Sequence, residues 1–172
     1  MNKRVPVCGK AVVLLFAAIS LLCTAATAQH ATHTVRSITP EAALRAARAA
    51  LAHCAKEGWQ VAVALSDRAG QPLVMLRDRF AGPHTPATAQ AKAYTALSFK
   101  LDTLGFARAT REGEAQSGIR NLPGVVAAGG GRPLESAGSI VGAIGVSGAP
   151  TGEADDACAR AGIAEIADDL EL

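Results

Sequence analysis

The sequence is poor in aromatic residues, which make up only 3% of its 172 residues. Proteins that bind single-stranded nucleic acid stack bases on aromatic rings and neutralise phosphates with a surplus of Lys and Arg. The formal net charge is +2, but residues 1–28 hold three basic residues and no acidic one. The rest of the chain carries 14 basic against 15 acidic residues. This composition predicts a protein that does not bind nucleic acid.

The chain also lacks a hydrophobic run of the length that spans a bilayer, about 18 residues or more. Its uncharged run from Ala11 to Leu22 has 12 residues, follows three basic residues, and precedes the small residues Ala26-Thr27-Ala28. This pattern is typical of a signal peptide. We predict a signal peptide over residues 1–28, with no membrane attachment after cleavage and a periplasmic or secreted mature chain. Cys23 raises the alternative of a lipid anchor, although Leu22 precedes it where such sites require a small residue.

Cysteine is scarce once this segment is set aside. Only Cys54 and Cys158 remain in the predicted mature chain. In an oxidising compartment they either form one disulfide or act as two small hydrophobic side chains at the edges of helix stripes. The sequence has no C-x-x-C, no Cys–His cluster at zinc spacing and no H-E-x-x-H. We therefore predict no zinc site.

Nucleotide-binding motifs are missing as well. The stretch "SIVGAIGVSGAPTGEADD", residues 139–156, is rich in glycine, but it has neither the G-x-G-x-x-G spacing nor a following G-K-[ST]. Its alternation is typical of a central strand and puts Ile140, Gly142, Ile144 and Val146 on one face and Val141, Ala143, Gly145 and Ser147 on the other. Asp155 and Asp156 then fall in the first turn of a helix, where they would repel phosphate, and we interpret them as solvated charges.

The remaining sequence alternates between helical and strand periodicity. Thr39-Pro40-Glu41 is typical of a helix start, and Gly58 ends that helix. The turn residues 67–70 separate two β-rich segments, which predicts a hairpin. The expected order is helix 41–57, strands 60–67 and 71–79, helices 85–99 and 106–114, two or three strands within 124–148, and a last helix from 152 to 170.

This order predicts the α+β class, with an antiparallel sheet covered by helices rather than alternating βαβ units. Residues 29–38 are polar and are expected to form a flexible lead. No second block of composition follows, so residues 39–172 are expected to form one domain.

Four segments resemble, in order, signature segments of the GlcG/HbpS family, also called the haem-degrading or DUF336 domain. They are "SDRAGQPLVMLRDRFAGPHT", "AQAKAYTALSF", "VVAAGGGRPL" and "SIVGAIGVSGAPTGEADDACARAGI". The resemblance extends over residues 38–170. Its most specific parts are Gly-Gly-Arg-Pro-Leu at 130–134 and Val-Gly-Ala-Ile-Gly-Val-Ser-Gly at 141–148.

The resemblance implies a profilin-like or roadblock-like α/β sandwich, often assembled into homo-oligomers, and haem or a related tetrapyrrole as cofactor of some exported members. The family fold lays the first and last helices on one side of the sheet, which implies that Cys54 and Cys158 lie close enough for a disulfide. The Lys-Ala pair at Lys92 resembles the family's "KA" element. This gives Lys92 the role of an anion contact or of a buried structural cation.

A haem site requires an apolar slot, an iron ligand and basic groups for the propionates. Among the candidate ligands we favour His84, because Pro83 and Pro86 restrict the loop in which it lies. The basic residues expected at the same rim are Arg77, Arg79 and Lys92.

Other candidate ligands have a simpler interpretation. His30 and His33 form an H-x-x-H pair that would bind a metal ion loosely or belong to a solvated tail. His53 is interpreted as a surface residue near a helix end, and Met75 as a core residue.

We predict an exported protein that binds or handles haem as a small-molecule ligand and forms a homo-oligomer. The alternatives are a small enzyme or sensor accessory that acts on an unidentified small anion at the same rim, and a structural oligomeric module. The sequence does not identify a catalytic group, because Ser147 lacks the G-x-S-x-G spacing. Adjacent carboxylates such as Asp168 and Asp169 do not face each other across a substrate.

Overall fold

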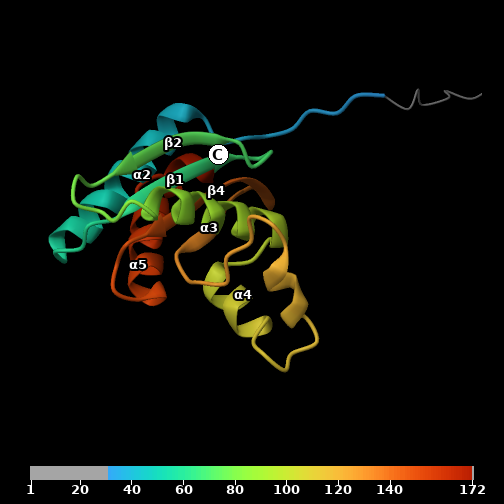
Figure 1. Ribbon diagram of the computed structural model, residues 1–172. Coiled ribbons are helices and arrows are strands. Elements are labelled where there is room, and N and C mark those ends of the chain that lie inside the picture. Colours follow the sequence, from blue (N-terminus) through green and yellow to red (C-terminus); the bar gives the residue numbers. More distant parts are fainter. Residues whose placement is uncertain (1–30, 172) are drawn as a thin grey trace, which may run out of the picture. The chain divides into compact units, whose positions relative to one another are not determined.

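The computed structural model describes residues 31–171, and its elements all lie in the unit Val35–Leu172 (Figure 1). A four-stranded antiparallel sheet forms its centre, in the order β2-β1-β4-β3. The strands are β1 (Ala62–Asp67), β2 (Pro72–Arg77), β3 (Gly131–Ser136) and β4 (Ser139–Ser147). Helices lie on both faces of the sheet, which confirms the predicted α+β class with flanking helices.

The predicted signal peptide, residues 1–28, and His30 lie outside the described residues. Within residues 31–171, no helix combines the length and the apolar character that crossing a membrane requires.

The hairpin between β1 and β2 is the one that the turn residues predict. Asp67 closes the turn, because its Oδ1 accepts hydrogen bonds of 2.8 Å from the backbone N–H groups of Ala69 and Gln71. Gly70 has a φ of 80°, a conformation that glycine adopts without strain. Strand β2 forms one edge of the sheet. Met75, which was expected in the core, is 40% exposed on this edge strand, so that prediction is wrong.

One face of the sheet is covered by α2 (Pro40–Lys56) and α5 (Gly152–Ala164). Both helices begin where the sequence indicates, since Thr39 and Thr151 accept hydrogen bonds from the backbone N–H groups of Ala42 and Ala154. The main apolar core lies between these helices and the sheet. Its larger buried side chains include Val61, Val63, Leu65, Leu134, Ile144, Val146 and Ile166.

The other face is covered by α3 (Thr85–Phe99), which lies across the inner strands (Figure 1). The contact consists of small residues, with alanines from α3 against alanines from β1 and β4. Gly145 brings the backbones together, because a Cβ at this position would lie 2.0 Å from the carbonyl oxygen of Ala89. Gly145 of β4 therefore allows the close packing of a helix on the sheet.

The predicted alternation along β4 is correct from residue 142 onward. Ile144 and Val146 lie in the core beneath α2 and α5, and Ala143 packs on the α3 side. The register shifts beside β3, where Leu134 faces Gly142 and Glu135 faces Ile140. This irregularity leaves Val141 without a partner in the register. Its side chain lies in the core beneath α2 and α5, on the same face as Ile144, whereas the alternation predicted the opposite face.

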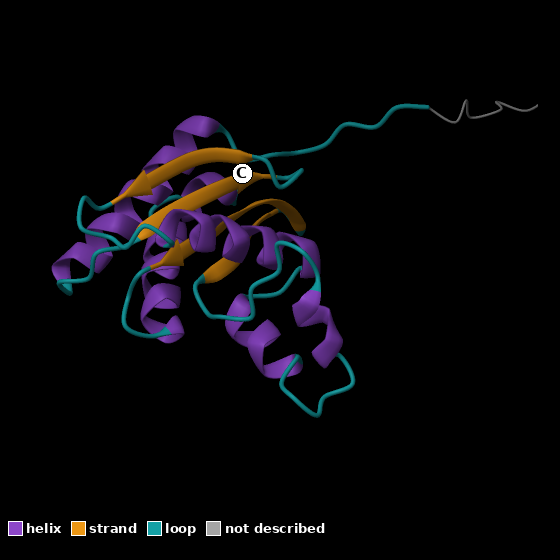
Figure 2. Ribbon diagram, in the orientation of Figure 1, coloured by secondary structure: helices purple, strands orange, loops and turns teal. Residues whose placement is uncertain are grey.

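Short helices connect the larger elements, and here the expected boundaries need correction. Helix α4 (Thr103–Ala109) begins before the expected residue 106, because Asp102 caps it by accepting a hydrogen bond of 2.8 Å from the Gly105 N–H. Figure 2 shows mostly loop between α4 and β3, with one short 3₁₀ helix, η1 (Ser117–Asn121). The last expected helix is divided into α5 and α6 (Ala167–Leu170).

Candidate functional site

The loop between β2 and α3, residues 78–84, is held by its own hydrogen bonds. The Arg77 Nη1 donates to the carbonyl oxygen of Ala81 at 2.8 Å, and Asp78 Oδ1 accepts from the Phe80 N–H at 2.8 Å. The Thr85 hydroxyl donates to the Gly82 carbonyl at 2.8 Å, and His84 is the residue at the N-cap of α3. The loop therefore presents its remaining side chains from a fixed backbone.

Three of the predicted site residues lie on or beside this loop, which we call the rim, defined by residues 77–84. Arg79 lies over the ring of Phe80, with its Cζ 5.3 Å from the ring centroid, and Phe80 is 76% exposed. His84 is also exposed, and its ring lies over Gly82, where a Cβ would come within 2.9 Å of the His84 Cε1. The rim thus combines an imidazole, two guanidinium groups and an exposed aromatic ring.

An apolar hollow lies along α3, and its first lining residue, Ala87, follows the rim by three residues. We call it the α3 pocket; it has a volume of about 350 Å³ and is lined by Ala87, Gln90, Ala91, Tyr94 and Gly124. His84 precedes Ala87 by three residues, and the spacing from His84 through Ala87 and Ala91 to Tyr94 is that of one helix face. His84 therefore lies at the N-terminal end of the helix face that carries Ala87, Ala91 and Tyr94, although its own ring lies over Gly82 and does not line the pocket.

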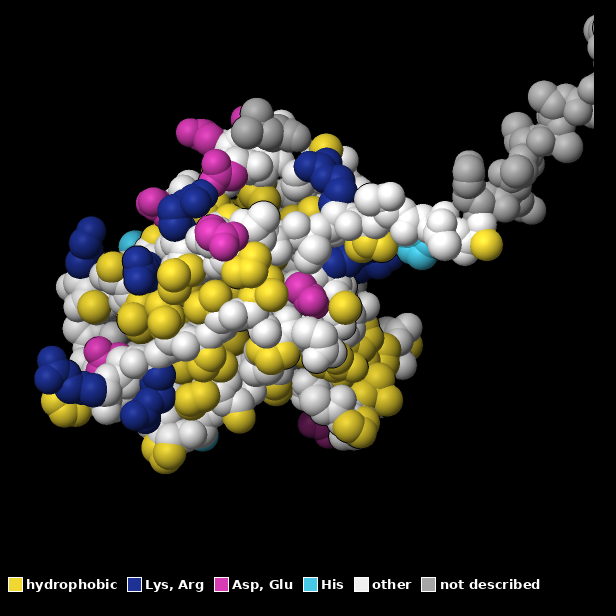
Figure 3. Space-filling model, turned by 90° about the horizontal axis from the view of Figure 1, so that it is seen from above, with side chains coloured by type: hydrophobic (Ala, Val, Ile, Leu, Met, Phe, Trp, Pro, Cys, Tyr) yellow, Lys and Arg dark blue, Asp and Glu magenta, His cyan; other side chains and the backbone are white. Residues whose placement is uncertain are grey.

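The neighbouring strand adds further apolar surface. Met75 in β2 is the register partner of Ala64, which packs against Ala89 of α3, so Met75 lies on the α3 side of the sheet. Met75 and Tyr94 are 40% and 42% exposed. Seen from above, hydrophobic side chains gather over the β2 edge of the sheet, with Lys and Arg side chains at one end (Figure 3). An apolar surface with basic residues at its end can hold a flat hydrophobic anion.

The structure does not bring Lys92 to the rim. Lys92 is only 3% exposed, and its Nζ donates to Asp155 Oδ2 at 2.6 Å and to the Val146 carbonyl at 2.9 Å. Of the two roles that the resemblance gave Lys92, its contacts are those of the buried structural cation. Of the basic residues predicted at the rim, Arg77 and Arg79 remain there.

The two aspartates that follow Gly152 are not the solvated charges that we expected. Asp155 is 4% exposed and also accepts a hydrogen bond of 2.9 Å from the Ala149 N–H. Burial raises the pKa of the Asp155 carboxyl above its ordinary value, and the charge of Lys92 opposes that shift. Asp156 is buried as well and accepts hydrogen bonds of 2.8 and 3.3 Å from Arg132. These ion pairs join α5 to α3 and β3.

The glycine-rich signature at residues 129–131 belongs to the same structural network. A Cβ at Gly131 would lie 2.3 Å from the carbonyl oxygen of Lys92, and one at Gly130 would lie 2.6 Å from the Asp155 Cβ. The Gly131 N–H donates to the Thr103 hydroxyl at 2.8 Å. This part of the sequence motif therefore lets α3 and α5 pack closely against the start of β3.

The other predicted residues lie outside residues 77–84, on other segments. His33 is exposed, and His53 is half-buried near the end of α2. Within residues 31–171, no group of three or more His, Cys, Asp or Glu side chains is placed to hold a metal ion. Cys54 of α2 and Cys158 of α5 are joined in a disulfide, with their Cα atoms 5.6 Å apart.

Comparisons with known proteins agree with this architecture. A family model described as "Haem degrading protein HbpS-like" matches residues 38–164. A double mutant of HbpS from Streptomyces reticuli is 40% identical and has a TM-score of 0.73, with 77% of this chain and 89% of that chain covered. A search of curated proteins found no match.

Two further solved structures are similar. The DUF336 protein ORFY from Klebsiella pneumoniae is 26% identical, with a TM-score of 0.76 and coverage of 80% of this chain and 96% of that chain. PduOC, solved as a complex with haem, is 28% identical, with a TM-score of 0.72 and coverage of 76% and 95%.

Proposed function

The chain belongs to the HbpS-like family of haem-degrading proteins, and from this premise we propose that it is an exported protein that binds haem between β2 and α3. The observation that carries the location is the stripe from His84 to Tyr94. It places an exposed imidazole three residues before Ala87 of the pocket, at the end of the loop that begins after Arg77 and includes Arg79. A haem complex is known for the similar protein PduOC.

The residues of the rim fit the chemical parts of haem. His84 would ligate the iron, and Arg77 and Arg79 would face the propionates, since guanidinium groups pair well with carboxylates. Phe80 and Tyr94 would contact the porphyrin ring. When bound, haem would supply an iron centre with a strong visible absorption. Lys92 takes no part, because Asp155 already neutralises it inside the protein.

A homo-oligomer belongs to the same proposal. The α3 pocket is lined by α3 and by Gly124 of one loop, so a haem seated on it would keep its outer face exposed to water. A second copy of the chain placed over the uncovered β2 edge would remove that apolar surface from water. Export supports the haem proposal in turn, because the predicted signal peptide would bring the protein to a compartment where it meets free haem.

Haem titration of the purified protein tests the location. A Soret band should grow to saturation with micromolar or tighter affinity, and Ala87→Glu should weaken binding about tenfold or more because it adds bulk and negative charge to the α3 pocket. Ala52→Glu is the matched control, since Ala52 is exposed on α2, on the other face of the sheet. Equal affinities of the two variants would place the haem elsewhere, and no binding by the wild type would contradict the proposed function.

Native mass spectrometry of protein from its natural compartment tests export and assembly. We expect a chain that begins at Gln29, an oligomer of identical chains, and alkylation of Cys54 and Cys158 only after reduction. A chain that retains residues 1–28, or carries lipid on Cys23, would contradict the cleavage that we propose. A monomer at all concentrations would contradict the homo-oligomer.

A further inference from the structure

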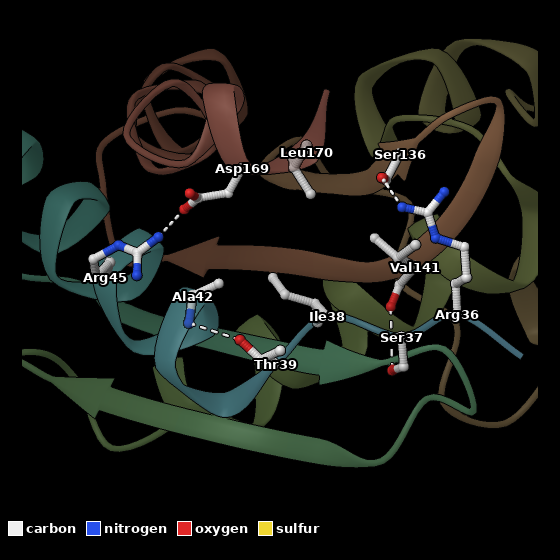
Figure 4. Close-up of a pocket in the computed structure, with 10 residues that line it drawn as sticks. All are labelled: Arg36, Ser37, Ile38, Thr39, Ala42, Arg45, Ser136, Val141, Asp169 and Leu170. Carbon is white, nitrogen blue, oxygen red and sulfur yellow. Dashed lines mark hydrogen bonds and ion pairs between the residues drawn. The ribbon is translucent and has the colours of Figure 1, made fainter. Parts of the chain in front are cut away.

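A second cavity lies on the opposite face of the sheet from α3, between the start of α2, the β3–β4 hairpin and α6 (Figure 4). We call it the α2 pocket; it has a volume of about 290 Å³, and the residues that matter here are Arg36, Ile38, Arg45, Ser136, Val141 and Leu170. It is distant from the rim in the sheet. Val141 lies near the start of β4, whereas the partners of Arg77 in the register are at the start of β1 and, beyond it, at the end of β4.

The segment that forms one wall is fixed to the sheet. The Ile38 N–H donates to the Val141 carbonyl at 2.9 Å, and the Arg68 Nη1 donates to the Ile140 carbonyl at 2.7 Å. The Ser37 hydroxyl accepts a further hydrogen bond of 3.2 Å from the Arg68 N–H. The pocket is therefore built from backbone that pairs with β4 and does not depend on a free loop.

The two arginines of the pocket differ in their partners. Arg45 forms an ion pair with Asp169 of α6, so its charge is already compensated. Arg36 donates from Nη2 to the hydroxyl of the buried Ser136 at 2.9 Å. Among residues 31–171, no carboxylate lies within ion-pair distance of Arg36. A guanidinium has five N–H donors, so Arg36 keeps donors and a charge for a ligand.

The floor between the two arginines is apolar. Figure 4 shows Ile38, Val141 and Leu170 between Arg45 at one end and Arg36 at the other. Phosphate or a sugar would leave these side chains without a suitable partner, and a second ligand carboxylate would have to displace Asp169 from Arg45. The lining matches a molecule with one anionic group and a short apolar chain.

We propose that the α2 pocket binds a small aliphatic monocarboxylate. Arg36 forms a bidentate pair with the carboxylate. Ser136 accepts a hydrogen bond from the guanidinium of Arg36 and so helps to orient it. Ile38, Val141 and Leu170 contact the alkyl chain. This site is independent of the haem proposal, because it shares no residue with the rim or the α3 pocket.

Titration of the purified protein with sodium hexanoate tests the site, with hexan-1-ol as the neutral probe of the same chain length. Calorimetry should show saturable binding of hexanoate, and methyl signals of Ile38, Val141 and Leu170 should shift in NMR spectra. Arg36→Gln should weaken hexanoate binding about tenfold or more, while Arg36→Lys, which keeps the charge but not the fork, should weaken it less. Arg48→Gln is the matched control, because it removes an exposed arginine of α2 outside the pocket.

The Arg36 variants should fold like the wild type, because this side chain is exposed and its replacement leaves the core intact. Equal binding by hexanoate and hexan-1-ol would overturn the role of the charge. Unchanged affinity of the Arg36→Gln variant, methyl shifts confined to other regions, or no binding of hexanoate would overturn the site.

Discussion

Lys92 and Asp155 show at the residue scale how a family signature can serve the fold rather than a ligand. A buried ammonium group is costly unless a carboxylate and hydrogen-bond acceptors surround it. Here Asp155 Oδ2 lies 2.6 Å from the Lys92 Nζ, and the Val146 carbonyl accepts a second hydrogen bond. The pair joins α3 to α5 across the end of β4, so its loss should affect stability before it affects ligand binding.

A double-mutant cycle on this pair measures that effect. Lys92→Met and Asp155→Leu should each lower the free energy of unfolding by about 3–5 kcal/mol, because each leaves one buried charge without its partner. The double variant should lose less than the sum of the two, since neither charge remains. Urea unfolding followed by circular dichroism gives all four free energies.

The exposed ion pair between Arg45 and Asp169 is the control for this cycle. Both side chains are about half exposed, so Arg45→Ala and Asp169→Ala should each change the free energy of unfolding by about 0–1 kcal/mol. Additive losses at Lys92 and Asp155, or losses as small as those at Arg45, would show that the buried pair does not support the fold as described.

At the scale of elements, the contact between α3 and the sheet depends on alanine and glycine residues, whose small size lets the backbones approach. Alanines face alanines, and Gly145 and Gly131 let the helix backbone approach the strands. The opposite face uses larger apolar side chains beneath α2 and α5, and the disulfide between Cys54 and Cys158 joins those two helices. The contact between α3 and the sheet determines the position of the rim, because His84 lies at the N-terminus of α3.

Gly145→Ala should therefore destabilise the protein more than an ordinary glycine replacement. The added methyl group would overlap the Ala89 carbonyl, and overpacking of this kind costs about 1–3 kcal/mol or more. Gly118→Ala is the matched control, because a Cβ at Gly118 meets no atom within 4 Å. Thermal unfolding of both variants should show a clear loss only for Gly145→Ala; equal melting temperatures would mean that the helix and sheet do not pack this closely.

The sequence predicted the elements well because their signals are local. Periodicity, the caps Thr39 and Thr151 and the turn at Asp67 each act within a few residues. The partners of Asp155 could not be found in this way, since Lys92 lies 63 residues away. Both aspartates are buried against partners in α3 and β3, and Met75 is exposed because β2 is an edge strand; no local pattern reports either arrangement.

The same limit applies to the candidate site. His84, Arg77 and Arg79 are close in sequence to one loop, so their common location could be expected. The α3 pocket adds Gly124, which comes from a loop far along the chain, and no spacing in the sequence links it to Tyr94. Arg36 and Ser136 of the α2 pocket are 100 residues apart, so their contact could not be predicted either.

At the scale of the whole unit, Val35–Leu172, the two proposed ligand sites lie on opposite faces of the sheet. The α3 side has exposed apolar side chains with Arg77, Arg79 and His84 at one end. The α2 side has a smaller pocket. It is lined by Arg45, which is paired with Asp169, and by Arg36, which has no ion-pair partner among the described residues. Between them, the sheet and its buried ion pairs form a scaffold that ligand binding need not disturb. Variants of Arg79 and His84 should therefore change haem binding without changing stability, whereas Arg77 also holds the loop through its hydrogen bond to Ala81.

The absorption spectrum of bound haem in the His84→Ala variant tests the central claim most directly. His84 is exposed and forms no side-chain cap hydrogen bond, so its replacement should leave the free energy of unfolding unchanged. We predict a shifted Soret band and an affinity weakened about tenfold or more, which corresponds to about 1.4 kcal/mol, whereas His53→Ala should match the wild type. A Soret band and an affinity identical to those of the wild type would show that His84 does not ligate the iron and would contradict the account.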